Sequence, residues 1–197
     1  MRKLVFFVGG AGSGKTTLAK TLAKEKGVAI LDMDTLLRPA AVALMTQAGL
    51  DPNDRDSSAY KTLCRDLGYR ITMDAALENI ANDVDVFVIG PFTKETETPR
   101  WIEQELSTIG ATLFDVDVKV VFVYLRDAKL HYDRIVQRGS ALDQYKLDNW
   151  SEFSRSLVRR ELKWRLPASS VLYFDNSKGL DGQSLAELER FVYDGSV

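Results

Sequence analysis

The residues best suited to chemistry form the stretch Gly9–Thr16, which reads GGAGSGKT. It matches the spacing G-x-x-x-x-G-K-[ST], in which glycines let backbone N–H groups turn inward around a phosphate. The apolar run Leu4–Val8 precedes this stretch, and the helical run Thr16–Lys26 follows it. A strand, a glycine-rich loop and a helix N-terminus in this order are typical of phosphate binding. We therefore predict a phosphate-binding loop rather than a plain turn.

The residue types in this loop predict how it would bind ATP and Mg²⁺. Lys15 is expected to reach the β- and γ-phosphates and to act in catalysis, and the Thr16 hydroxyl is expected to hold Mg²⁺. The other expected nucleotide-binding residues come from the same loop and the start of the helix: Gly10, Ala11, Gly12, Ser13, Gly14 and Thr17.

Two carboxylates, Asp32 and Asp34, follow the second apolar run of the chain. Residues i and i+2 of a strand point the same way, so both should project beyond the carboxyl edge of a sheet, where α/β proteins bind ligands. We predict that Asp32 supports the metal ion and that Asp34 orients or deprotonates an acceptor hydroxyl. The alternative is that Asp34 only caps a helix beginning at Thr35, while Asp32 makes a structural hydrogen bond.

Five apolar runs are predicted to be the strands that position these residues. They are Lys3–Val8, Val28–Leu31, Val86–Ile89, Lys119–Tyr124 and Val171–Phe174. Because the runs are continuously apolar, both faces of the sheet should be covered, as in parallel sheets. Their alternation with helices predicts an α/β fold with a five-stranded parallel sheet.

Helical patterns separate these runs. The expected helices span 16–26, 35–48, 57–67, 72–82, 99–109, 127–138, 149–166 and 182–192. Gly68 is expected to end the third of them. Thr98 is expected to cap the helix whose first residue is Pro99.

Length and composition limit the classes of protein that fit. The 197 residues fit one domain, 1–197, and a formal net charge of −2 gives no electrostatic reason to expect a nucleic acid partner. Cys64 is the only cysteine, which excludes an internal disulfide and favours a reducing, cytoplasmic location. No apolar run reaches the length of a membrane span, so no membrane partner is expected. The only histidine, His131, is expected to be exposed and without a role.

A third motif, Asp133–Arg138, reads DRIVQR and places Arg134 and Arg138 four residues apart on one helical face. Taken alone, this spacing also fits two solvated arginines on an exposed helix.

With this motif, the phosphate-binding loop and the Asp-x-Asp pattern, the chain resembles the small P-loop kinases. That group includes shikimate, gluconate and nucleoside-monophosphate kinases, antibiotic phosphotransferases of similar build and AAA-type kinases. Leu31–Leu36, with Pro39 following, resembles the gluconate kinase pattern, and Asn53–Arg55 is loosely similar to the same family. The resemblance implies a three-layer P-loop NTPase fold with the five parallel strands in the order 2-3-1-4-5. It also implies an ATP-dependent phosphotransferase that moves the γ-phosphoryl group to a small-molecule acceptor at a hydroxyl.

The similarity of Asp133–Arg138 to the lid entrance of adenylate kinases implies further roles. Arg134 would stack on the adenine, and Arg138 would act in catalysis by neutralising charge on the transferring phosphoryl group. Residues 139–148 would be a short lid that closes and expels water. In similar kinases the loop after the last strand contacts the adenine edge, which indicates Asn176 as a further nucleotide contact.

Candidate acceptor-binding residues follow the third strand. This strand ends without the acidic residue that motor and switch ATPases use, which favours a kinase. Gly90, Pro91 and Phe92 could line the acceptor pocket, or they could form only a strand-ending turn.

Two arginines near the Asp-x-Asp pattern, Arg38 and Arg55, could also grip the acceptor, or they could be surface charges. Residues 35–82 are therefore expected to form a helical acceptor-binding region. Whether Arg155 and Arg159 belong to the site stays open.

Three other functions stay open. In a nucleoside-monophosphate kinase, Arg38, Arg55 and Arg65 would converge on the acceptor phosphate. A toxin-type kinase would act on a nucleotide sugar, and a regulator would bind ATP without catalysis. The expected partner is a small molecule, and the expected assembly is a monomer or a homodimer.

Overall fold

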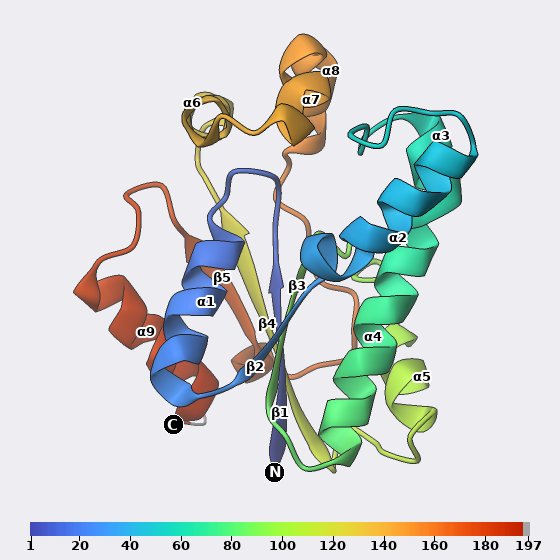
Figure 1. The fold of residues 1–197 in the computed structure, drawn as a ribbon. Helices are drawn as coiled ribbons and strands as arrows, with labels where there is room; N and C mark the ends of the chain where they lie inside the picture. Colours follow the sequence, from blue (N-terminus) through green and yellow to red (C-terminus); the bar gives the residue numbers. More distant parts are fainter. Residues whose placement is uncertain (195–197) are drawn as a thin grey trace.

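The computed structural model describes residues 1–194 and contains one sheet of five parallel strands (Figure 1). The strands are β1 (Arg2–Val8), β2 (Ala29–Asp32), β3 (Val86–Gly90), β4 (Val116–Tyr124) and β5 (Val171–Asp175). They follow the order β2-β3-β1-β4-β5, which confirms the predicted fold class and strand order.

The register of the strands aligns their carboxyl ends. Val8 pairs with Gly90 of β3 on one side and with Phe122 of β4 on the other. The residues that follow β1, β3 and β4 therefore meet at one edge of the sheet. This alignment places the phosphate-binding loop in the middle of that edge.

Helices cover both faces of the sheet (Figure 1). On one face, α1 (Lys15–Lys26) and α9 (Gly182–Tyr193) pack against alternate strand residues such as Val5 and Phe7. On the other face, α4 (Asp66–Ala81) and α5 (Trp101–Ser107) pack in the cluster that contains Leu4 and Phe6. Because successive strand residues point to opposite faces, burial on both sides requires the uninterrupted apolar runs.

Residues 58–81 form one long helical segment. The short helix α3 (Ser58–Tyr60), a π-helical turn η1 (Lys61–Arg65) and α4 follow one another without a break. The predicted break at Gly68 is therefore wrong. A Cβ at Gly68 would lie 2.7 Å from Cδ2 of Leu37, so this glycine instead lets α2 (Met33–Gln47) pack closely against α4.

The chain between β4 and β5 differs most from expectation. After α6 (Ala128–Arg138), residues 139–156 form η2 (Ala141–Asp143), α7 (Gln144–Asp148), α8 (Trp150–Phe153) and η3 (Ser154–Ser156). The predicted helix 149–166 is therefore wrong beyond its first turns. Residues 157–167 are not helical, and η4 (Ala168–Ser170) leads into β5.

Tertiary contacts explain why this helix stops. The backbone N–H of Lys163 donates to the Thr96 carbonyl at 2.9 Å, and Nε1 of Trp164 donates to the Glu95 carbonyl at 2.7 Å. Trp164 is buried in the core beside α4 and α5. The expected helix 99–109 is shorter too, because α5 begins at Trp101 with Arg100, not Thr98, as its N-cap residue.

Residues 1–194 contain no helix whose length and hydropathy would suit a bilayer crossing.

Phe92 lies inside the core and not at a surface. Its ring is fully buried, with its centroid 5.3 Å from that of Phe6 and 4.9 Å from that of Tyr69. A Cβ at Gly90 would lie 2.8 Å from the Phe92 ring, so Gly90 makes room for this ring. Gly90 and Phe92 therefore serve the packing of the core, and their acceptor contacts stay a prediction.

This burial predicts that Phe92→Ala lowers the free energy of unfolding by about 3–5 kcal/mol, because it leaves a cavity among packed rings. Urea denaturation measures the change. Phe114→Ala is the matched control, because Phe114 is 94% exposed and its replacement should change stability by less than about 0.5 kcal/mol. Equal effects of the two substitutions would contradict the core position of Phe92.

Candidate functional site

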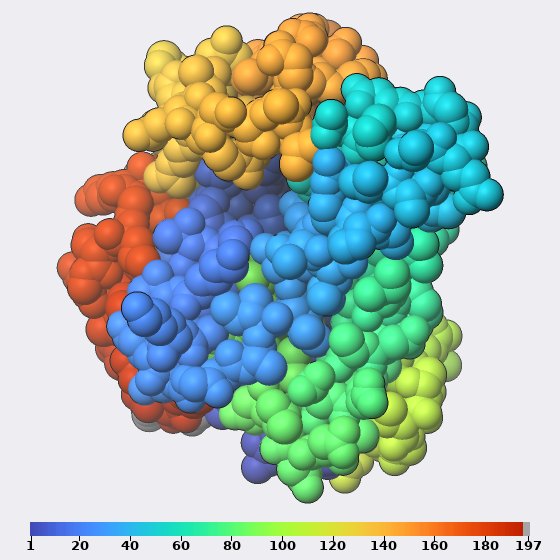
Figure 2. All heavy atoms as spheres, viewed as in Figure 1, coloured from blue at the N-terminus to red at the C-terminus, as the bar shows by residue number. Residues whose placement is uncertain are grey.

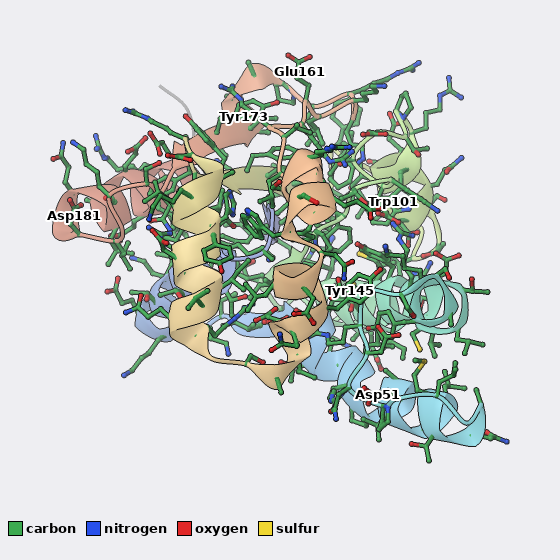
Figure 3. The ribbon with its side chains drawn as sticks, turned by 90° about the horizontal axis from the view of Figure 1, so that it is seen from above. Asp51, Trp101, Tyr145, Glu161, Tyr173 and Asp181 are labelled. Atoms are coloured by element: carbon green, nitrogen blue, oxygen red, sulfur yellow. The ribbon has the colours of Figure 1, made fainter. Side chains whose placement is uncertain are left out.

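A cavity of about 590 Å³ lies at the carboxyl edge of the sheet. Its walls come from the phosphate-binding loop, from the end of β4, from the helical segment 58–81 and from residues 139–160, which we call the lid segment. Figure 2 shows a hollow between the lid segment, in orange, and the blue residues beneath it. Seen from above, Tyr145 of the lid segment lies on the side that faces the helices of residues 58–81 (Figure 3).

Close backbone approach shapes the phosphate-binding loop. A Cβ at Gly9 would lie 2.2 Å from the Val123 carbonyl oxygen of β4, and one at Gly14 would lie 2.2 Å from Nδ2 of Asn176. Gly14 has a φ of 93° and precedes the first residue of α1, Lys15. Glycine is therefore required both by the left-handed turn and by the strands that flank the loop.

Lys15 brings a desolvated positive charge to the cavity. Its Nζ lies 3.5 Å from the Gly10 carbonyl oxygen. Burial lowers the pKa of Lys15, while the charges of Asp34 and Asp32 oppose that shift. A bound phosphate would place its negative charge beside this ammonium, as in other phosphate-binding loops.

Asp32, not Asp34, caps the second helix. Helix α2 begins at Met33, and Oδ1 of Asp32 accepts the backbone N–H of Asp34 at 3.1 Å. The alternative that Asp34 caps a helix starting at Thr35 is therefore wrong. The other carboxylate oxygen of Asp32 accepts the Thr16 hydroxyl at 3.4 Å. Burial raises the pKa of Asp32, and the nearby Asp34 raises it further.

The pair Thr16 and Asp32 fits a hard divalent cation. Both supply oxygen ligands, and Mg²⁺ is usually bound by one or two carboxylates together with substrate phosphates. Within residues 1–194, no group of three or more His, Cys, Asp or Glu side chains is placed to hold a metal ion. A cation beside Thr16 would therefore need phosphate oxygens to complete its ligand set.

Asp34 lines the cavity and forms an ion pair with Arg55. Burial disfavours its ionised form, but the charges of Arg55 and Lys15 outweigh burial and lower the pKa of Asp34. The two aspartates therefore face different partners, with Asp32 beside Thr16 and Asp34 between two cations. The ionised form of Asp34 is therefore favoured, as a group that accepts a proton requires.

His131 was missed by the sequence analysis. Its side chain is buried, not exposed, and Nδ1 lies 2.7 Å from the Ala11 carbonyl oxygen. A Cβ at Gly12 would lie 3.0 Å from the His131 carbonyl oxygen, so α6 packs directly on the loop. The signal in the sequence was the spacing of His131, Arg134 and Arg138, which share one helical face.

Arg134 and Asn176 meet at the phosphate-binding loop. Arg134 donates to the carbonyl oxygens of Ser13 at 3.3 Å and Asn176 at 2.7 Å, and Nδ2 of Asn176 donates to Ser13 at 2.7 Å. Among residues 1–194, the Ser13 hydroxyl and Oδ1 of Asn176 are buried without a hydrogen-bond partner. The structure thus joins three residues predicted to bind nucleotide, while their contacts with a base stay a prediction.

Two other predicted arginines have different surroundings. Arg138 lines the cavity and pairs with Asp143 of the lid segment. Arg38 instead donates to the Pro52 carbonyl at 2.6 Å and to Oδ1 of Asn53 at 2.9 Å. Arg38 holds a loop in place and does not line the cavity, and its acceptor contact stays a prediction.

The acceptor side of the cavity contains residues that the sequence did not bring together. Pro91 lines it as predicted, and so do Lys61, Arg65 and Tyr69. Residues eight apart in an α-helix point about 80° away from each other. The extra residue in the π-helical turn η1 reduces this offset to about 20°, which aligns Lys61 with Tyr69.

Arg65, in the middle of this row, is already neutralised. One guanidinium nitrogen donates to both carboxylate oxygens of Glu95 at 3.0 Å. The guanidinium also lies 4.4 Å from the centre of the Tyr69 ring.

Comparisons with known proteins agree with the observed fold. The family described as an AAA domain, AAA_33, matches residues 4–159. None of the curated proteins compared with the sequence matches it.

Solved structures show the same fold. A candidate kinase of Chloroflexus aurantiacus is 12% identical with a TM-score of 0.66, covering 100% of this chain and 99% of its own. A sugar kinase of Janibacter sp. is 18% identical with a TM-score of 0.60, covering 100% and 96%. A gluconokinase of Sinorhizobium meliloti is 17% identical with a TM-score of 0.50, covering 98% and 90%.

The buried His131 predicts a loss of stability on acidification. Burial, foremost, lowers the pKa of His131 below its ordinary value of 6.5 in the folded protein. The unfolded chain therefore takes up a proton first, and stability that is fully present above pH 6.5 falls as the pH drops toward the folded-state pKa. Urea denaturation from pH 7.5 to 5.5 should show a steeper decrease for the wild type than for His131→Asn. Equal slopes would contradict the prediction, because no other histidine titrates.

Proposed function

The chain belongs to the AAA_33 family of AAA domains, and on this premise we propose that it is an ATP-dependent phosphotransferase acting on a hydroxyl of a small molecule. The observation that carries the proposal is that Lys15 and the Asp34–Arg55 pair line one cavity at the carboxyl edge of the sheet. A nucleotide with its phosphates on the loop would direct its γ-phosphoryl group toward Asp34. The kinase-like fold supports this class of reaction.

The phosphate side of the site positions the nucleotide. The loop amides and Lys15 would bind the β- and γ-phosphates, while Thr16 and Asp32 would hold Mg²⁺. When bound, the cation supplies charge neutralisation for the phosphates. Arg134 and Asn176 would lie on the base side of the loop, where both hydrogen-bond the Ser13 carbonyl.

The acceptor side orients the attacking hydroxyl. Asp34 is kept ionised by Arg55, so it can accept the hydroxyl hydrogen bond and later the proton. Arg138 lines the same cavity and would stabilise charge on the transferring group. Most of the rate enhancement would come from position and electrostatics, because phosphoryl transfer requires little covalent chemistry from the protein.

The charge pairs favour an alcohol acceptor over a nucleoside monophosphate. A phosphate-bearing acceptor would need several arginines free to bind it. Arg55 is paired with Asp34 and Arg65 with Glu95. A polyol or sugar acid is therefore the first acceptor class to test, which is in keeping with the named activities of the Janibacter and Sinorhizobium proteins.

Lys15→Ala tests nucleotide binding. The loss of a charge-assisted contact should weaken ATP binding about 10- to 100-fold. Titration with a fluorescent ATP analogue measures the change. Lys24→Ala, at an exposed position of α1, is the matched control and should bind as the wild type does. If Lys15→Ala binds as tightly as the control, the phosphate-binding role of the loop is refuted.

Asp34→Asn tests transfer. ADP release in the presence of gluconate, shikimate, hexoses or nucleoside monophosphates should separate a kinase from a regulator, which would show no acceptor dependence. With the acceptor found, Asp34→Asn should lower kcat about 10²- to 10⁴-fold, because the hydroxyl loses its proton acceptor. ATP affinity should change little. A variant with undiminished kcat would remove Asp34 from the mechanism.

A further inference from the structure

We propose that Lys146 and Asp56 are positioning residues, whose ion pair fastens the lid segment to the loop that carries Arg55. In this arrangement, closure of the lid segment and placement of the Asp34–Arg55 pair are one coupled event. The inference rests on the proposed function for its catalytic meaning, but the coupling itself is a property of the protein without ligand.

The ion pair joins two walls of the cavity. Nζ of Lys146, in α7, lies 2.8 Å from Oδ2 of Asp56 and 3.2 Å from Oδ1 of Asp143. Asp143 also pairs with Arg138. Arg138, Asp143, Lys146 and Asp56 therefore form a row of alternating charges from the lid entrance to the opposite wall. All four line the cavity.

Hydrogen bonds hold the loop that contains Asp56 in a defined conformation. We call residues 51–57 the acceptor loop. Oδ1 of Asp54 accepts the backbone N–H groups of Asp56 and Ser57, each at 3.0 Å. Arg38 holds the same loop to α2 through the Pro52 carbonyl. A displacement of Asp56 must therefore also displace the adjacent residue Arg55, which is the ion-pair partner of Asp34.

The burial of these charges distinguishes the pair from an ordinary surface ion pair. The side chains of Lys146 and Asp56 are 12% and 19% exposed, and that of Asp143 is 4% exposed. Removing one partner leaves a desolvated charge without compensation, which is costly, whereas exposed pairs contribute little. The pair Lys129–Asp133 on α6 has side chains that are 75% and 51% exposed, and it supplies a matched control.

No other described contact replaces this one. Within residues 1–194, it is the only hydrogen bond or ion pair that joins the lid segment to the acceptor loop. The aromatic contact between Trp150 and Tyr132 holds the lid segment to α6 instead. The ion pair therefore determines whether the lid segment and the acceptor loop move together.

Coupling of this kind has a use in phosphoryl transfer. Water competes with the acceptor hydroxyl unless the site is closed, and closure completes the catalytic arrangement. In the structure, the lid segment is fastened to Asp56 while the adjacent Arg55 holds Asp34. Loss of the pair should therefore raise ATP hydrolysis without acceptor relative to transfer, and raise the acceptor KM while nucleotide affinity stays unchanged.

Hydrogen exchange in the ligand-free full chain tests the coupling. The variants are Lys146→Met, Asp56→Asn, the double variant, Lys146→Arg as the conservative replacement and Lys129→Met as control. Each single variant should speed amide exchange in both 51–57 and 139–149 by about threefold to tenfold, and the double variant should add no further increase. Lys146→Arg should restore slow exchange, and Lys129→Met should leave both segments unchanged.

Several outcomes would overturn the proposal. Faster exchange confined to 139–149 in Lys146→Met would show a local role within the lid segment. Additive effects in the double variant would show that the two residues act independently. A second measurement, binding of a fluorescent ADP analogue, separates this inference from the proposed function. A wild type that binds no nucleotide would refute the phosphotransferase but would leave the exchange result intact.

Discussion

The close packing of neighbouring elements against the phosphate-binding loop is the constraint on which the rest of the site depends. The backbone carbonyl of Val123 and the side-chain amide of Asn176 occupy the space that side chains at Gly9 and Gly14 would need. Helix α6 closes the same loop from outside through His131. The loop is thus held by β4, by the segment after β5 and by α6, so its amides are positioned before any ligand arrives. Preorganised donors of this kind give the most effective binding of developing charge.

The charges around the cavity divide into two groups. On the acceptor side, two arginines are paired with carboxylates, Arg55 with Asp34 and Arg65 with Glu95. On the phosphate side, Lys15 has a long contact with the Gly10 carbonyl, and the charges of Asp34 and Asp32 act on it as well. In the proposed reaction, the phosphates of a nucleotide would meet Lys15, and Asp34 would face the acceptor hydroxyl.

Predictions from local sequence patterns were wrong where contacts with residues far away in the sequence determine the structure. Gly68 looked like a helix end, but it lies inside α4 because α2 packs against it. Residues 157–167 do not form the predicted helix, because the backbone N–H of Lys163 and the indole N–H of Trp164 donate to carbonyls that follow β3. Phe92 was taken for a pocket residue although its ring fills the core. In each case the partner is far away in the sequence, so no window of neighbouring residues contains the information.

The phosphate-binding loop and the five strands could be predicted from the amino-acid sequence, because glycine spacing and uninterrupted apolar runs are local properties with few structural solutions. The order of the strands followed from the resemblance to small P-loop kinases. Asp34, Arg55 and Arg138 were predicted as site residues, and all three line the cavity. The packing of separate elements was needed to see that Asp32 caps α2, that Arg38 supports a loop, that His131 is buried on the loop and that Lys146 reaches Asp56. These facts depend on which side chains from separate elements come within a few ångströms, and that distance is set by packing and by the register of the sheet.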